Sequence, residues 1–191
     1  MTAQPNVPAT PAVAPSALHA SASPTDTAAG TPARPTFFTL PAVTRTCSFV
    51  LPAAPDRIFP LLCPVREYDW IPTWRAEILH TVSGVAEENC VFRTTVHGGA
   101  AMTWVVNRYE PPTRIEFTCF VPDHYVFRLK IVLRPVPTGT ELTWTRYWLA
   151  TAPSDAAYAE ASAAGRFDET MAALERLLVH YLQTGAMLRS P

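Results

Sequence analysis

Three polar side chains could take part in acid–base chemistry or hold an anionic group: Tyr68, Asn107 and Arg146. Arg146 alternates with Trp144 and Trp148 along a strand-like segment, which predicts that it shares their face of a sheet. On a buried face its guanidinium would need an acidic partner from a ligand or the protein, because an unpaired buried charge costs several kcal/mol. The opposite orientation, with Arg146 in solvent and its other neighbours inside, stays open because both faces of this segment carry large apolar residues.

The cysteine and histidine residues form no recognisable catalytic or metal-binding motif. The four cysteines are Cys47, Cys63, Cys90 and Cys119, and none lies within four residues of another, so no CxxC pair exists. No HExxH or GxSxG segment occurs, and the histidines of the folded part are scattered: His80, His97, His124 and His180. We expect no metal, no cofactor, structural or surface histidines, and cysteines that act as small buried side chains in a reducing compartment.

Composition and charge exclude several classes of protein. With 15 Lys and Arg against 16 Asp and Glu, the net charge is near zero, and no basic cluster marks a face for nucleic acid. No segment has the roughly 18 apolar residues of a membrane span. The N-terminal segment lacks the basic start and unbroken apolar stretch of a secretory signal. We therefore expect a cytoplasmic protein with no integral membrane segment and no nucleic-acid partner.

The first part of the chain differs from the rest in composition. Residues 1–36 contain seven prolines, ten alanines, no aromatic residue and only two charged residues. Such a segment cannot bury enough apolar area to offset its ordering entropy, so we expect a disordered tail. A transit peptide would also be rich in serine, threonine and alanine, but it would carry several arginines and this segment has one. Residues 37–191 have the usual size of a single domain.

Alternation of apolar and polar residues predicts seven antiparallel strands. They cover residues 43–51, 76–82, 90–97, 100–109, 114–121, 125–134 and 140–150. A short helix over 54–62, with Pro60 inside it, is expected after the first strand. The aromatic segment 65–74 is then expected to cover one end of the core.

One hairpin sets a strand register. Gly98-Gly99 predicts a two-residue turn, since glycine permits positive φ at both positions. This turn places Phe92 opposite Val105. It also places Arg93 opposite Trp104 on the other face, as an exposed cation–π pair.

The last predicted element is a helix over roughly 154–185. Ser154 or Asp155 would cap its start and Gly185 its end, while Gly165 inside it favours a bend. An apolar stripe at helical spacing is expected to face the sheet. The stripe consists of Phe167, Met171, Leu174, Leu178 and Tyr181.

The order of these elements and three strings, IFPLLCPVREYDWIPTW, TWVVNRYEPPTRIEF and GTELTWTRYW, resemble the START-like, Bet v 1-like superfamily called SRPBCC. Within it the chain is similar to the bacterial polyketide cyclase/dehydrase and lipid-transport group, over about residues 44–184. The resemblance implies an α+β helix-grip fold: a curved antiparallel sheet of about seven strands wrapped around a long C-terminal helix, with short helices after the first strand. It also implies a cavity for an apolar or aromatic small molecule.

The side chains expected to line that cavity come from the aromatic segment, the inner sheet face and the last helix. They are Tyr68, Trp70, Trp74, Phe92, Val105, Asn107, Phe117, Cys119, Phe127, Leu129, Ile131, Trp144, Arg146, Trp148, Phe167, Met171, Leu174 and Leu178. The same residues would also form an ordinary filled core.

Three functions remain open. The leading one is binding or transport of a small hydrophobic molecule, such as a lipid, polyketide, sterol-like or quinone ligand. The second is an enzyme of the polyketide cyclase/aromatase or dehydratase type in the same pocket, which needs no catalytic motif. The third is a protein-interaction module with a filled core, in which exposed aromatic side chains around Trp70 and Trp74 bind a partner. No feature of the sequence specifies an oligomeric state.

Overall fold

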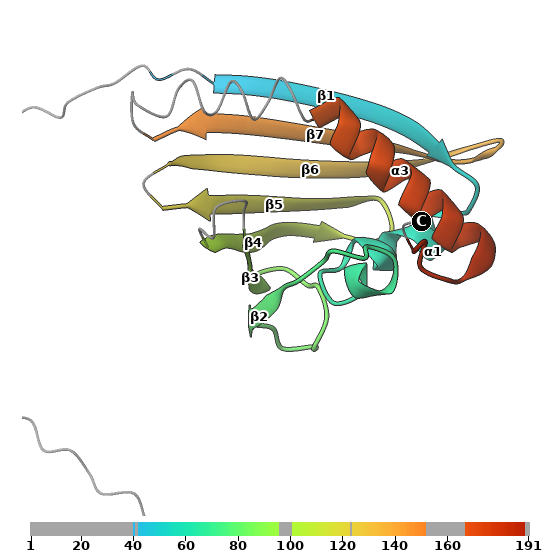
Figure 1. Ribbon diagram of the computed structural model, residues 1–191, viewed down its shortest axis with the longest axis horizontal. Helices are drawn as coiled ribbons and strands as arrows, with labels where there is room; N and C mark the ends of the chain where they lie inside the picture. The colour runs from blue at the N-terminus through green and yellow to red at the C-terminus, as the bar shows by residue number, and fades with distance from the viewer. Residues whose placement is uncertain (1–39, 41, 96–100, 123, 152–166, 190–191) are drawn as a thin grey trace, which may run out of the picture. The chain divides into compact units, whose positions relative to one another are not determined.

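The computed structural model describes residues 40, 42–95, 101–122, 124–151 and 167–189. They form a seven-stranded antiparallel sheet with the strand order β1-β7-β6-β5-β4-β3-β2 and a C-terminal helix (Figure 1). The elements are β1 (Ala42–Leu51), α1 (Pro55–Ile58), the 3₁₀ helices η1 (Phe59–Leu62) and η2 (Glu67–Asp69), β2 (Glu77–His80), β3 (Val91–Thr95), β4 (Ala101–Glu110), β5 (Arg114–Val121), β6 (Tyr125–Val136), β7 (Gly139–Ala150) and α3 (Phe167–Thr184). The expected α+β helix-grip fold is confirmed.

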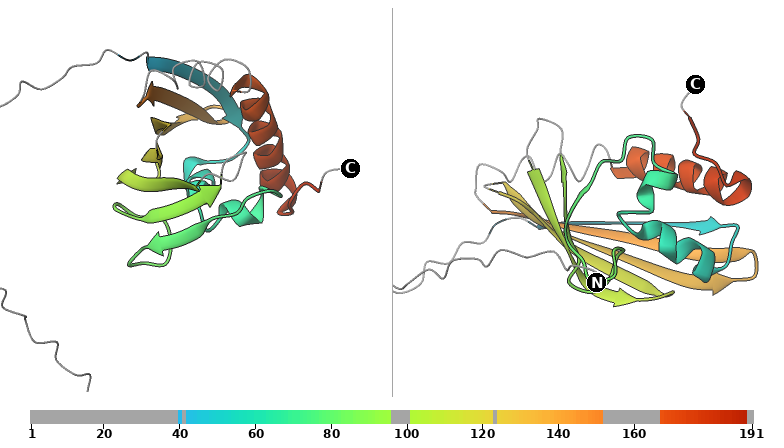
Figure 2. Two further views of the ribbon diagram at one scale, coloured as in Figure 1. Left: turned by 60° about the vertical axis from the view of Figure 1, so that its left-hand side comes forward. Right: turned by 90° about the horizontal axis from the view of Figure 1, so that it is seen from below.

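The helices lie together on the concave side of the curved sheet. Figure 2 shows α3 and the short helices on the same side, and α3 packs along β1. Helix α3 ends as predicted at Gly185, whose φ is +69° and whose N–H donates to the Tyr181 carbonyl at 2.8 Å. The predicted start at 154, the bend at Gly165 and the predicted tail 1–36 lie outside the described residues. No helix within the described ranges is long and apolar enough to span a membrane.

Strand β6 shows why the pattern of this sheet could be predicted. Tyr125, Phe127 and Leu129 are buried, whereas Arg128 and Lys130 between them are exposed. Neighbouring strands continue the same alternation, so the concave face carries the apolar core and the convex face is polar.

The first strand is joined to the last at a tight corner. The Thr140 hydroxyl donates to the Ala53 carbonyl at 2.7 Å, and Gly139 lies against the Leu51 carbonyl with φ +141°. A Cβ at Gly139 would overlap that carbonyl oxygen. Glycine is therefore required where β7 begins.

The predicted helix after β1 is divided in two. Pro55–Ile58 is α-helical and Phe59–Leu62 continues as a 3₁₀ helix. Pro60 has no N–H to donate and stands in the first turn of the second piece, where that hydrogen bond is not needed.

The predicted register of the β3–β4 hairpin is wrong by one residue. Phe92 pairs with Trp104, not with Val105, and Arg93 pairs with Thr103. The last described pair is Thr95 with Ala101, and residues 96–100 between them, including Gly98-Gly99, lie outside the described residues. A shift of one residue reverses the faces of a strand. It places the Trp104 ring on the concave face, stacked on Phe92 with centroids 5.5 Å apart, instead of on the surface beside Arg93.

Candidate ligand site on the concave face of the sheet

Strand β7 directs Arg146 towards the concave face. Its neighbours at alternate positions, Leu142, Trp144 and Trp148, are buried, while Tyr147 is 39% exposed on the convex side. The orientation that the sequence left open is therefore the inward one. Arg146 itself is half-buried.

The surroundings of Arg146 are mostly aromatic. The guanidinium carbon lies 5.8 Å from the ring centroid of Trp144 and 5.8 Å from that of Phe167. Both rings offer cation–π contacts, but neither accepts a conventional hydrogen bond. The Nε of Arg146 is shielded from solvent and has no hydrogen-bond partner among the described residues. The indole Nε1 of Trp144 is also shielded from solvent and has no hydrogen-bond partner among the described residues.

The protein disfavours the charged form of Arg146. Burial lowers the pKa of its guanidinium to about 10, against the opposing influence of Tyr125, Cys119 and Glu67. These three groups come from β6, β5 and η2, so the topology gathers polar side chains from distant segments around one arginine.

Glu67 is the acidic group of this cluster, and the sequence analysis missed it. It stands on η2, half-buried, and its carboxylate has no hydrogen bond or ion pair with any described residue. Burial raises the pKa of Glu67 to about 8, and Arg146 acts in the opposite direction. The carboxyl group is therefore largely protonated at neutral pH.

Helical geometry explains why Glu67 points inward. Its N–H donates to the Cys63 carbonyl at 2.9 Å, and its own carbonyl accepts from Trp70 at 3.3 Å. Cys63 and Trp70 are buried, so the spacing of four and three residues puts Glu67 on their face. Arg66 and Asp69, on the other side, pair with each other at 2.5 Å near the surface. This spacing was the signal that could have identified Glu67.

Aromatic rings form a continuous chain across the concave face. Successive ring centroids lie between 4.9 and 6.2 Å apart from Phe92 through Trp104, Phe127 and Trp148 to Phe167. Trp104, which the wrong register had placed outside, is at the centre of this chain. Its indole N–H donates to the Thr94 hydroxyl at 2.9 Å.

Most of the predicted lining residues occupy this face. The buried ones are Phe92, Phe117, Cys119, Phe127, Leu129, Ile131, Trp144, Trp148, Phe167, Met171 and Leu178, and Leu174 is partly buried. Their contact with a ligand stays a prediction. Burial raises the pKa of the Cys119 thiol, which leaves it neutral and unsuited as a nucleophile.

Three predicted residues of the aromatic segment make side-chain hydrogen bonds to the backbone. Tyr68 is 42% exposed, and its hydroxyl donates to the Ala76 carbonyl at 2.9 Å, so its selection as an interior acid–base residue was wrong. Trp70 is fully buried and donates to the Leu61 carbonyl at 2.8 Å. Trp74 is half-buried and donates to a backbone carbonyl at 2.7 Å. The segment covers the core as expected, but exposed tryptophans for a protein partner are not found there.

Val105 and Asn107 lie on the convex face, so their selection as lining residues was also wrong. Asn107 is exposed and accepts a hydrogen bond from the Thr118 hydroxyl at 3.1 Å. The corrected register explains the position of Val105: Trp104 shares the concave face with Phe92, so the next residue points to the convex face. An irregularity between Val106 and Arg108 then bends the strand beside Asn107.

The convex face holds a buried carboxylate, Glu116, which contrasts with the half-buried Glu67. Glu116 is 5% exposed and accepts hydrogen bonds from Arg114, at 2.6 Å from its Nε, and from Arg128 at 3.4 Å. These pairs satisfy the charge of Glu116 inside a groove of about 340 Å³. The carboxylate of Glu67 has no such partner among the described residues.

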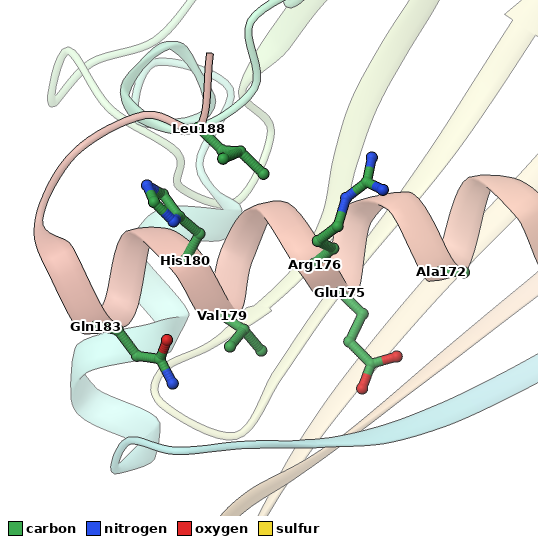
Figure 3. Close-up of a pocket in the computed structure, with 7 residues that line it drawn as sticks. All are labelled: Ala172, Glu175, Arg176, Val179, His180, Gln183 and Leu188. Carbon is green, nitrogen blue, oxygen red and sulfur yellow. The ribbon is translucent and has the colours of Figure 1, made fainter. Parts of the chain in front are cut away.

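A shallow groove also runs along α3 (Figure 3). It has a volume of about 390 Å³ and is lined by Ala172, Glu175, Arg176, Val179, His180, Gln183 and Leu188. Apart from Leu188, which follows the helix, these positions are on a different face of α3 from Phe167, Met171 and Leu178. The groove is therefore separate from the cluster around Arg146.

Comparison with known proteins identifies the family of this chain. A family described as polyketide cyclase / dehydrase and lipid transport matches residues 42–179, and the chain belongs to this family. The predicted SRPBCC, Bet v 1-like superfamily is thereby confirmed. Comparison with curated proteins gives no match.

Solved structures share the fold. Protein MLL2253 from Mesorhizobium loti has a TM-score of 0.55 at 17% identity, covering 72% of this chain and 98% of its own. A protein from Rhodobacter sphaeroides has a TM-score of 0.54 at 21% identity, with coverages of 73% and 92%. Ara h 8.0201 has a TM-score of 0.54 at 12% identity, with coverages of 75% and 99%. At these identities the likeness concerns the fold alone.

Proposed function

We propose that the protein binds a small hydrophobic molecule on the concave face of the sheet, with an anionic oxygen of that molecule at Arg146. The observation that carries the proposal is the shielded Nε of Arg146, which has no hydrogen-bond partner in the described part of the chain. An unsatisfied buried donor costs roughly 1–3 kcal/mol. A ligand oxygen would remove that cost and form a charge-assisted hydrogen bond.

The aromatic chain supports the hydrophobic part of the proposal. The rings of Trp144 and Phe167 lie beside the guanidinium and provide flat apolar surface. Burial of apolar ligand area against them is worth about 25 cal/mol per Å². Membership of a family of cyclases, dehydrases and lipid-transport proteins supports the same class of ligand, a lipid-like or polyketide-like molecule.

An enzyme of the cyclase or dehydratase type in the same site is the second candidate. One feature favours it: burial raises the pKa of Glu67 to about 8, which suits a group that exchanges a proton at neutral pH. Native mass spectrometry of the purified protein would reveal a co-purifying molecule. Recovery of that molecule with changed mass after incubation would support an enzyme, and recovery unchanged would support a carrier.

Two fluorescent dyes that differ by one sulfonate group test the proposal directly. Anilinonaphthalene sulfonate carries one negative charge, and phenylnaphthylamine lacks the sulfonate. Arg146→Ala should weaken binding of the charged dye by about tenfold or more, since it removes a buried charged partner. Binding of the uncharged dye should change far less.

A matched control uses the arginine on the neighbouring strand. Arg45 pairs with Arg146 across the β1–β7 ladder but is exposed. Arg45→Ala should therefore leave the affinity for both dyes close to that of the wild type. Unchanged affinity of Arg146→Ala for the charged dye, with folding intact by circular dichroism, would overturn the proposal.

A further inference from the structure

The groove on the convex face of the sheet carries an excess of positive charge. It has a volume of about 340 Å³, and its lining residues come from β1, β7, β6 and β5. Three of them are cations, Arg114, Arg128 and Lys130, and one is a carboxylate, Glu116. The groove therefore has two positive charges that no lining residue neutralises.

The buried carboxylate of this groove holds both arginines. Glu116 is 5% exposed, and its two oxygens accept from different guanidinium groups. Oε1 accepts from the Nε of Arg114 at 2.6 Å, and Oε2 accepts from Arg128 at 3.4 Å. These bonds restrict both guanidinium groups before a ligand binds. Less side-chain entropy is then lost when a ligand is bound.

Arg128 and Lys130 keep hydrogen-bond donors that are unused within the described part of the chain. A guanidinium has five N–H donors and an ammonium group has three. Arg128 gives one of its donors to Glu116, and its side chain is 61% exposed. The side chain of Lys130 has no hydrogen bond or ion pair with any described residue. These donors are available to an anion in the groove.

Hydroxyl groups of β7 add uncharged donors beside these cations. Thr145 accepts a hydrogen bond from the Thr46 hydroxyl at 3.2 Å, so its own hydroxyl proton remains available. The strand register places Thr145 opposite Lys130 and Tyr147 opposite Arg128. Residues directly opposite in a sheet have Cβ atoms about 4.5–5.5 Å apart. Two cations and two hydroxyl groups therefore share one small area of the convex face.

Other acidic groups of the convex face do not neutralise this excess. Glu110 pairs with Arg108 at 2.6 Å, and Glu141 pairs with Arg134 at 2.6 Å. Neither carboxylate is among the residues that line the groove. Within the described part of the chain, the groove thus keeps its two excess positive charges.

We infer that this groove binds a phosphate monoester, whose head group is held by Arg128 and Lys130 with hydroxyl donors from β7. A phosphate monoester carries close to two negative charges at neutral pH, which matches the two excess charges of the groove. Its oxygens accept charge-assisted hydrogen bonds from guanidinium and ammonium groups. The groove is on the opposite face of the sheet from Arg146, so this inference goes beyond the proposed function and does not depend on it.

Two probes of similar shape test the match of charge. Phenyl phosphate carries about two negative charges at about pH 8, because its second pKa is about 6, whereas benzenesulfonate carries one. Isothermal titration calorimetry at low ionic strength, where exposed charges interact most strongly, would measure both affinities. The wild-type protein should bind phenyl phosphate about tenfold or more tightly than benzenesulfonate.

Three alanine variants locate the binding charges. Lys130→Ala and Arg128→Ala should each weaken phenyl phosphate binding by about tenfold, since each removes a charged hydrogen-bond donor. Arg134→Ala is the matched control, because it removes the same charge from the same face of β6 but outside the groove. Its affinity should stay within about twofold of the wild type. All three side chains are exposed, so the variants should fold.

Amide chemical shifts provide a test that needs no substitution. Phenyl phosphate should shift the backbone signals of Thr44, Lys130 and Thr145, which line the groove, more than those of Met171 and Leu178 on α3. Binding of the uncharged dye phenylnaphthylamine to the concave face should be equal in the wild type and in Lys130→Ala.

The phosphate monoester group occurs both on soluble molecules and on the membrane lipid phosphatidate, and vesicles distinguish these two sources. Sedimentation of the protein with phosphatidate vesicles, but not with phosphatidylcholine vesicles, would assign the groove to the lipid if Lys130→Ala abolishes it. Binding of phenyl phosphate without such sedimentation would assign the groove to a soluble molecule.

Three results would overturn the inference. They are the absence of phenyl phosphate binding, equal affinities for the two probes, and an equal loss of affinity in Arg134→Ala and Lys130→Ala. The last result would mean that the probe responds to the net charge of the face and not to the groove. The proposed function would stand in each case, because its test depends on Arg146.

Discussion

Replacement of Arg146 by methionine is expected to stabilise the protein while weakening its affinity for an anionic ligand. Arg146 is half-buried against Trp144 and Phe167, with an Nε that has no partner among the described residues. A side chain retained for binding commonly lowers stability, because its polar atoms are satisfied only in the complex. Methionine fills similar space with no charge and no donor.

The magnitude follows from two opposing contributions. Burial lowers the pKa of Arg146 from 12.5 to about 10, which corresponds to roughly 3 kcal/mol against the charged form in the folded state. Methionine avoids this cost but loses the cation–π contacts with Trp144 and Phe167, each worth about 1 kcal/mol. The difference is about 1 kcal/mol of added stability. For a domain of this size the melting temperature should rise by about 2–4 °C.

Thermal unfolding followed by circular dichroism at neutral pH would measure this change. Arg45→Met is the matched control, since Arg45 occupies the paired position on β1 but is exposed. Its effect should stay within about 0.5 kcal/mol. A melting temperature of Arg146→Met several degrees below the wild type would refute the reasoning. It would mean that the contacts of the guanidinium stabilise the folded state by more than the free energy that its burial costs.

Two other predictions concern the fold. Gly139→Ala should destabilise the protein by roughly 3 kcal/mol or more in urea unfolding, because the new Cβ overlaps the Leu51 carbonyl oxygen at a φ of +141°. Gly84→Ala, at φ +82° but in open space, should cost only about 1 kcal/mol, and equal losses would contradict the steric argument. Hydrogen bonds from two backbone N–H groups of the preceding loop lower the pKa of Glu87 to about 2. The stability that these bonds provide is therefore present above the usual pKa of 4.5 and disappears as pH falls towards 2. Glu87→Gln should flatten this acid dependence of the melting temperature, and an unchanged acid dependence would exclude that role.

The strand pattern could be predicted because most strands have one buried face. On β5 and β6 the period of two is clear, and the predicted range 114–121 agrees with the structure. Such alternation fixes both the strand and its inner side. The inner residues Phe117 and Phe127 were therefore identified correctly as buried from sequence alone.

Register and orientation were harder to predict where local signals conflict. The Gly98-Gly99 pair favoured a register with Phe92 opposite Val105, yet Phe92 pairs with Trp104. Burying the large indole of Trp104 among aromatic rings outweighs the turn preference. On β7 large residues occupy both faces, so only the assembled sheet decides where Arg146 points.

Glu67 shows a different limit. Its position near Arg146 joins η2 to β7 across a long stretch of sequence, and no local pattern encodes that distance. A carboxylate on a short helix is usually a surface group. Its spacing of four residues from Cys63 and three from Trp70, both buried, indicated which face of the helix it occupies. No pattern in the sequence indicated that Arg146 influences it.

The strand order also bears on how the chain acquires this structure during synthesis. Every strand from β2 to β6 pairs with its immediate successor, whereas β1 pairs only with β7, and the paired Thr46 and Thr145 are 99 residues apart. On the ribosome β1 emerges first, and about a hundred further residues are synthesised before β7 is available to pair with it. Such distant pairing slows folding and leaves an apolar strand open to other chains in the interval. Nascent chains that end before residue 139 should therefore be the form that depends most on chaperones.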